Sequence, residues 1–179
     1  NGNEALIKKY AEKLSISFER VEYAKNNFIR VVKVMKAFVL NDSVKSFLCL
    51  NNKLPQENKG LFDIKLLEEF ADAIIKLYGI KGLKGKDLLY SINSEDYDAK
   101  RAEFIQRLSK GEKLFVISSY NTVGAGQNLQ YKAPGNATIV AVNDYDRGDM
   151  EKDFDCIYLE KPTNLLVNVD SKKGIEAEN

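Results

Sequence analysis

The chain has 179 residues, of which 44% are apolar and 30% charged, and its 27 Lys and Arg nearly balance its 26 Asp and Glu. This composition is typical of a soluble globular domain, and the near-zero net charge gives no electrostatic argument for binding to nucleic acid or to an anionic membrane. The sequence has no histidine and only two cysteines, which excludes Ser-His-Asp triads, Cys-His dyads, His-ligated zinc and four-cysteine zinc sites.

The first part of the chain has a helical pattern. From Glu4 to about Asn41, apolar residues recur at spacings of three and four among many lysines, and residues 15–17 are expected to mark a break. The short apolar run Ser46–Leu50 then predicts a buried strand. After a loop rich in Pro, Asn and Gly, Asp63 is expected to cap a helix over Ile64–Tyr78.

The second part of the chain alternates between strands and helices. Ser94 is expected to cap a helix over Glu95–Leu108, and the predicted strands are Leu88–Asn93, Lys113–Ser118, 137–142 and 156–159. Continuously apolar strands that alternate with helices predict an α/β fold, a parallel sheet with helices on both faces. We expect a helical extension over residues 1–43, the α/β domain over 44–170 and a tail over 171–179.

The two cysteines and the ends of the chain lead to further expectations. Cys49 and Cys156 lie in apolar runs and are expected to be buried free thiols. No stretch reaches the ~18 apolar residues of a membrane span, and no signal peptide is visible, so we expect a cytoplasmic protein with no membrane partner. Because the chain begins Asn1-Gly2-Asn3, we also expect it to be part of a larger protein.

The most informative segment is Ser118-Ser119-Tyr120-Asn121-Thr122-Val123-Gly124-Ala125-Gly126-Gln127-Asn128-Leu129. It directly follows a predicted parallel strand, and open parallel sheets bind ligands at the carboxyl ends of their strands. Two glycines one residue apart would let the backbone approach a phosphate or a sugar. A connecting loop without a ligand is the other interpretation of this spacing.

Here the sequence resembles a family. The order of strands and helices from Ser46 to Ser119, followed by TVGAGQNLQ, is similar to the second RecA-like (helicase C-terminal) domain of superfamily 2 DEAD/DEAH-like helicases. Gly124-Ala125-Gly126-Gln127-Asn128-Leu129 resembles helicase motif V, and Phe154–Pro162 resembles the strand that follows it. The resemblance implies a RecA-like fold of the P-loop NTPase type.

The resemblance also implies site residues and ligands. It places Gly124, Gly126, Gln127 and Asn128 against ATP, with Asn128 near the ribose. Ser119, Tyr120 and Thr122 fall near positions that contact nucleic-acid phosphates, although a threonine is usual where Tyr120 stands. The implied partners are DNA or RNA and a first RecA-like domain, with ATP and Mg²⁺ as cofactors of the full-length protein and none bound tightly to this segment.

Several elements of an ATPase are not found in the sequence. There is no Gly-x4-Gly-Lys-Ser/Thr loop; the nearest imitation, residues 79–87, has the wrong glycine spacing and is expected to be a basic loop. The arginine-finger element of the family, motif VI, does not follow residues 156–159. We therefore assign no catalytic or metal-binding residue and expect no ATP hydrolysis by this segment alone.

Two alternatives stay open. The first is a non-catalytic α/β module that binds a partner protein through its N-terminal helices. The second is a dinucleotide-binding fold, in which Gly124-x-Gly126 precedes a ribose-binding Asp144. Against the second, Leu129 stands in the place of the third glycine, and Pro134-Gly135 interrupts the phosphate-binding helix.

Overall fold

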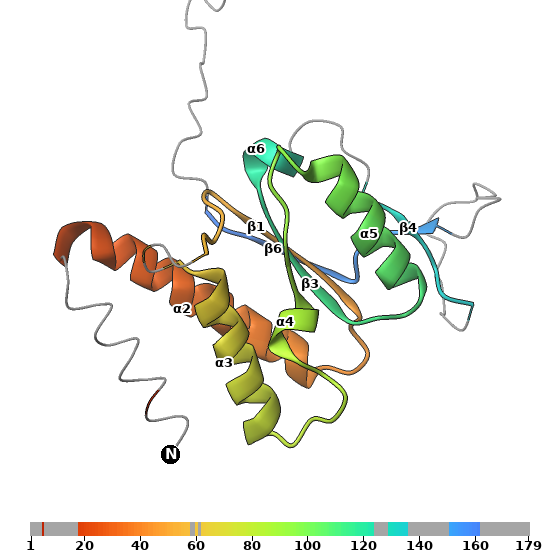
Figure 1. Ribbon diagram of the computed structural model, residues 1–179, viewed down its shortest axis with the longest axis horizontal. Helices are drawn as coiled ribbons and strands as arrows, with labels where there is room; N and C mark the ends of the chain where they lie inside the picture. Colours follow the sequence, from red (N-terminus) through yellow and green to blue (C-terminus); the bar gives the residue numbers. More distant parts are fainter. Residues whose placement is uncertain are drawn as a thin grey trace, which may run out of the picture.

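The computed structural model describes residues 5, 18–57, 60, 62–123, 129–135 and 151–161 (Figure 1). Within these residues helices and strands alternate along most of the chain. The elements are, in order, α2 (Phe18–Leu40), β1 (Ser46–Asn51), α3 (Ile64–Leu77), α4 (Gly85–Leu88), β2 (Leu89–Ser91), α5 (Tyr97–Ser109), β3 (Leu114–Ser119), α6 (Tyr120–Val123), β4 (Tyr131–Lys132), β5 (Glu151–Lys152) and β6 (Cys156–Leu159).

A four-stranded sheet in the order β2-β3-β1-β6 forms the centre of the fold, and every pairing in it is parallel. β1 lies between β3 and β6, with Ser46 opposite Leu114 and Phe47 opposite Cys156. The α/β class and the parallel sheet are therefore confirmed. The strand predicted over 137–142 lies outside the described residues, and among the described strands β6 is the last one in the sheet, beside β1.

Helices cover both faces of this sheet, as Figure 1 shows. On one face α2 and α3 pack over Phe47, Cys49 and the Phe115 ring. On the other face α5 packs over the alternate residues of the same strands, which include Leu48 and Val116. Because successive strand residues point to opposite faces, a continuously apolar strand supplies both cores. α2 is part of the first core, to which it contributes Phe28, Val31, Met35, Phe38 and Val39.

The helix α3 begins where the sequence predicts. Asp63 has an extended backbone, and its side chain accepts a hydrogen bond from the Lys65 N–H at 2.9 Å. This bond satisfies one of the N–H groups that the first turn of a helix leaves without a partner. The prediction of Asp63 as the N-cap is confirmed.

The start of α5 differs from the prediction. The helix begins at Tyr97 with Asp96 as its N-cap, not at Glu95 with Ser94. The Asn93 side chain accepts from the N–H groups of Glu95 (2.8 Å) and Asp96 (3.0 Å), which holds residues 93–96 in a turn. An asparagine side chain that captures nearby N–H groups delays the first helical residue.

The segment predicted as a basic loop over 79–87 is in part helical, and this prediction was wrong at its end. Gly85 opens the short helix α4, and its N–H donates to Asp72 Oδ1 on α3 at 2.6 Å. Leu88, predicted as the first residue of a strand, is the last residue of α4, so that β2 covers only Leu89–Ser91. Contact with α3 overrides the loop-like local sequence.

The two cysteines were expected to be free thiols and to be buried; the first expectation is confirmed for both, and the second for one of them. Both are free; Cys49 is buried in the core, whereas Cys156 on the edge strand is only half-buried. In the part of the chain that the structure describes, no helix is both long enough and apolar enough to cross a membrane.

Asp155 joins the start of β6 to the start of β1. Its Oδ2 accepts from the N–H groups of Lys45 (2.7 Å) and Ser46 (2.9 Å), and its Oδ1 pairs with the Lys152 ammonium. Burial alone would raise the pKa of Asp155, but the Lys152 hydrogen bond and the two N–H groups outweigh it and lower the pKa below its usual value.

This arrangement predicts a dependence of stability on acidity. A carboxyl whose pKa is lower in the folded state stabilises the fold above its unfolded pKa, about 3.9, and loses that contribution as the pH falls through the folded pKa. Asp155→Asn is expected to lower the free energy of unfolding by about 1–2 kcal/mol at pH 7. Urea titrations from pH 7 down to pH 2 should show the two proteins converging below pH 4; a constant difference would contradict the assignment.

Candidate functional site at the carboxyl edge of the sheet

The carboxyl ends of β1 and β3 lie side by side at one edge of the sheet, where Asn51 is opposite Ser119. The chain that leaves β1 runs to α3 on one face, whereas the chain that leaves β3 reaches β4, whose Tyr131 packs in the core of the other face. Adjacent parallel strands whose connections leave toward opposite faces have a crevice between their carboxyl ends, where α/β proteins bind ligands. The predicted site residues that the structure describes lie at this edge.

Ser119 and Thr122 form one hydroxyl pair after β3. Ser119 Oγ lies 2.8 Å from Thr122 Oγ1 and accepts the Thr122 N–H at 3.2 Å. Ser119 therefore holds the single turn α6 (Tyr120–Val123) at the end of the strand. Both residues are half-buried, so their hydroxyl groups are held in place at the carboxyl edge of the sheet.

Tyr120, the third residue expected to contact phosphates, turns to a different partner. Its hydroxyl donates to the main-chain oxygen of Glu160, the residue after β6. Burial raises the pKa of Tyr120, with the neighbouring Glu160 charge acting in the same direction, so its hydroxyl remains a donor at neutral pH. Of the three residues, Ser119 and Thr122 therefore bond to each other, and Tyr120 bonds to the residue that follows β6.

The residues expected to contact ATP, Gly124, Gly126, Gln127 and Asn128, lie outside the described residues. The chain is described again from Leu129, which packs against the core on the α5 face. The expectations for these four residues therefore remain predictions.

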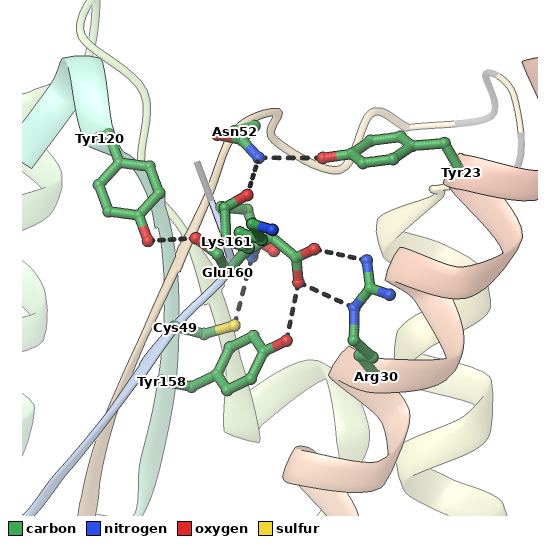
Figure 2. Close-up of polar contacts among 9 residues, drawn as sticks. Tyr23, Arg30, Cys49, Asn52, Tyr120, Tyr158, Glu160 and Lys161 are labelled. Carbon is green, nitrogen blue, oxygen red and sulfur yellow. Dashed lines mark hydrogen bonds and ion pairs between the residues drawn. The ribbon is translucent and has the colours of Figure 1, made fainter. Parts of the chain in front are cut away.

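The strongest polar cluster at this edge was not found from the sequence. The Glu160 carboxylate is only 4% exposed and accepts both from Arg30 on α2, through Nε at 3.0 Å and through Nη2, and from the Tyr158 hydroxyl at 2.7 Å (Figure 2). The hydrogen bond to Glu160 is the largest cause of the raised pKa of Arg30. Burial, followed by the bond to Glu160, raises the pKa of Tyr158 to about 12.

Asn52, just after β1, connects this cluster to the open side of the edge. Its amide group donates to the Lys161 main-chain oxygen at 2.9 Å and to the Tyr23 hydroxyl at 3.0 Å (Figure 2). The carboxyl ends of β1 and β6 and the first half of α2 are thereby joined by side-chain hydrogen bonds. A pocket of about 490 Å³ lies beside them, and Ser119 is among its lining residues.

The described groups at this edge are suited to binding a polar ligand. Burial raises the pKa of the Cys49 thiol to about 12, so the thiol is not a nucleophile at neutral pH. Among the described residues, no group of three His, Cys, Asp or Glu is placed to hold a metal ion. Hydroxyl and amide groups, together with the exposed residues Lys53 and Lys161 that follow β1 and β6, suit a polar or anionic ligand.

Only a weak signal in the sequence pointed to the Arg30–Glu160 pair. Arg30 lies between apolar residues of a helix, and Glu160 follows an apolar strand directly, so each is a charge at a position that favours burial. Pairing two such residues from opposite ends of the chain requires the sheet order, because β6 must lie beside β1.

Comparison with protein families finds no matching family model, and comparison with curated proteins finds no significant match.

Proposed function

We propose that this chain is the second motor domain of an ATP-dependent nucleic-acid helicase or translocase of superfamily 2, acting in the cytoplasm. In the whole protein it would close on a first RecA-like domain around ATP and Mg²⁺ and contact one strand of DNA or RNA. The observation that carries the proposal is the position of the Ser119–Thr122 hydroxyl pair. Ser119 is the last residue of the central parallel strand β3, and Thr122 lies just before the glycine segment that resembles motif V.

Two features of the same edge support a contact with nucleic acid. Lys53 and Lys161 are exposed and follow neighbouring parallel strands, and Asn52 joins the two segments through the Lys161 main-chain oxygen. Ammonium groups and hydroxyls are the groups that proteins use to hold a sugar-phosphate backbone without regard to sequence. A balanced net charge for the whole chain is compatible with such a local cationic edge.

The sheet order supports a motor domain as well. Domain closure around a nucleotide requires a rigid unit that presents loops from several strands on one side. Here Tyr120 and Asn52 tie the ends of β3 and β1 to the residues after β6, so the loops at this edge are fixed to one another. A movement of one loop on nucleotide binding would be transmitted to its neighbours.

The test uses the intact gene product that contains this segment. We first expect its coding sequence to continue upstream into a Gly-x4-Gly-Lys-Ser/Thr loop and downstream into the motif VI element. We then expect Thr122→Val to raise the concentration of single strand needed for half-maximal stimulation of ATP hydrolysis about tenfold, the effect of one lost hydrogen bond to a charged phosphate.

Ser43→Ala is the matched control, since Ser43 is an exposed hydroxyl residue at the opposite end of β1. It should leave the stimulation unchanged. Hydrolysis that no nucleic acid stimulates, or equal behaviour of the two variants, would contradict the proposal.

A further inference from the structure

The outer side of β6 has features of an interface that the motor function does not use. Among the described strands β6 is the last in the sheet, and β1 is its neighbour on the inner side. Ile157 and Leu159 are 56% and 57% exposed, although both are large aliphatic residues within a strand. Neighbouring exposed apolar side chains on a globular domain are a common mark of contact with another chain.

The main chain of β6 presents open hydrogen-bonding groups on the same side. The N–H of Glu160, the residue after β6, donates to the Leu50 oxygen at 2.9 Å, so the even-numbered residues of β6 direct their N–H and C=O groups toward β1. The groups of Ile157 and Leu159 therefore point away from β1, and in the described part of the chain no strand pairs with them. Such an edge is a template for the addition of another strand.

The exposed side chains of β6 extend the core on the α5 face. Ile157 lies beside Leu48 and Leu159 lies beside Leu50, and both of these β1 residues are buried in that core. The alternate residues of β6 pack against the core on the other face. A strand added beside β6 would place its own side chains against Ile157 and Leu159 and would continue the apolar layer past the end of the sheet.

The charges at the two ends of β6 have opposite signs. Asp153 precedes the strand, Lys161 follows it, and both residues are exposed. Asp155 also precedes the strand, but its carboxylate is already paired with Lys152. Antiparallel pairing of β6 with a second copy brings each Lys161 to the acidic end of the other strand, whereas parallel pairing brings like charges together. The edge is therefore complementary to itself in the antiparallel direction.

We propose that two copies of this chain form a dimer by antiparallel pairing of their β6 strands, about a two-fold axis at Tyr158. Ile157 of one copy lies opposite Leu159 of the other, and each such pair exchanges both of its main-chain hydrogen bonds. The two sheets become one continuous sheet with both α5 helices on the same face. Two-fold dimers of this kind are the commonest soluble oligomers, because one surface patch is its own partner.

The side chains select this register over its neighbours. In it Ile157 and Leu159 cover each other, and Lys161 of one copy lies opposite Asp155 of the other and beside its Asp153. A shift of two residues in one direction would place Leu159 opposite Asp155, and a shift in the other direction would place Ile157 opposite Lys161. Either shift pairs an aliphatic side chain with a charged one, so the register centred on Tyr158 buries the most apolar surface.

The first measurement is the mass of the 179-residue chain by sedimentation equilibrium. At micromolar concentrations the mass should rise from 20.2 kDa toward twice that value. Leu159→Lys should raise the dissociation constant at least about thirtyfold, because the two-fold axis applies the substitution twice. Leu77→Lys is the matched control, since Leu77 is 67% exposed at the end of α3, and it should leave the dimer unchanged. A mass that stays at 20.2 kDa, or equal weakening by the two variants, would overturn the proposal.

A charge exchange tests the antiparallel direction. Lys161→Glu and Asp153→Lys should each weaken the dimer about threefold, the effect of an exposed ion pair lost on both sides of the axis. The variant with both substitutions restores opposite charges at the contact and should regain the affinity of the unmodified chain. Losses that simply add in the double variant would overturn the antiparallel arrangement.

Disulfide cross-linking tests the register, in a Cys156→Ser background from which the half-buried thiol is removed; Cys49 is buried. Opposed residues of a hydrogen-bonded antiparallel pair have Cα atoms about 5.5 Å apart, which suits a disulfide. With oxidised glutathione, a mixture of Ile157→Cys and Leu159→Cys chains should form at least about fivefold more linked dimer than either chain alone. Each link joins two thiols and reduces one glutathione disulfide to two glutathiones. Equal linking in the three samples would overturn the register.

Hydrogen exchange identifies the other possible occupants of this edge. In the dimer the amide hydrogens of Ile157 and Leu159 should exchange more slowly as the protein concentration rises. A monomer that protects them at every concentration would show that another part of the same chain covers β6, and an unprotected monomer would leave the edge to a different protein. Either monomer would overturn the dimer. The dimer does not rest on the motor function, so failure of that proposal would leave these measurements unaffected.

Discussion

Replacing Arg30 with methionine is expected to lower the free energy of unfolding by about 2–3 kcal/mol. The substitution leaves the Glu160 carboxylate, 4% exposed, without its cationic partner. Removing one partner of a fully buried pair typically costs about 3–5 kcal/mol because an uncompensated charge remains in the interior. The smaller value is expected here because Arg30 is itself 42% exposed and Tyr158 still donates to Glu160.

Two further variants separate the charge from the packing of the side chain. Arg30→Lys keeps the charge but not the paired Nε and Nη2 donors, so we expect it to recover less than half of the loss. Arg30→Met combined with Glu160→Gln removes both charges and should recover more than half. Chemical denaturation of the unmodified chain, Arg30→Met, Glu160→Gln alone and the double variant gives the interaction energy directly; additive losses in the double variant would show that Arg30 acts only through its packing.

Gly85→Ala is expected to destabilise the fold by about 2–3 kcal/mol. A Cβ at this position would lie 2.2 Å from the Glu68 main-chain oxygen and 2.9 Å from its carbonyl carbon. Because the obstacle is the backbone of α3, no rotamer change relieves the contact, and α4 must move away from α3. That movement also stretches the bond from the Gly85 N–H to Asp72 Oδ1.

Gly135→Ala is the matched control, since a Cβ there meets no atom within 4 Å. Its midpoint of thermal unfolding should lie within about 2 °C of that of the unmodified chain, as expected of a surface change. A Gly85→Ala protein as stable as the Gly135→Ala protein would show that α4 is not held closely against α3.

The parts of the fold that the sequence predicted are those that a local pattern determines. Each of the strands β1, β3 and β6 contains a run of four apolar residues, and Asp63 stands immediately before a long amphipathic helix. A parallel sheet followed from the alternation of such strands with helices. The start of α5 was misplaced because three polar residues compete for the cap, and the contacts of Asn93 decide between them.

The site was predictable only in part, for a related physical reason. The resemblance pointed to Ser119, Tyr120 and Thr122, and the structure places all three at the carboxyl edge of the sheet. Their partners come from segments far away in the sequence: Tyr120 bonds to the Glu160 main chain, and Glu160 binds Arg30. Such contacts depend on which strands are neighbours, and a single sequence carries no local signal for strand order.

The position of β1 has a consequence for how the chain is made. β1 is an interior strand of the described sheet, and its partners come from residues far along the chain, since Ser46 pairs with Leu114 while Phe47 pairs with Cys156. The apolar segment of β1 therefore has no partner on either side until β3 has been synthesised, because Leu114 comes 68 residues after Ser46. Topologies of this kind fold slowly and expose strand edges during synthesis. Translation speed between β1 and β3, rather than the stability of the finished fold, is expected to set how much of the protein escapes aggregation.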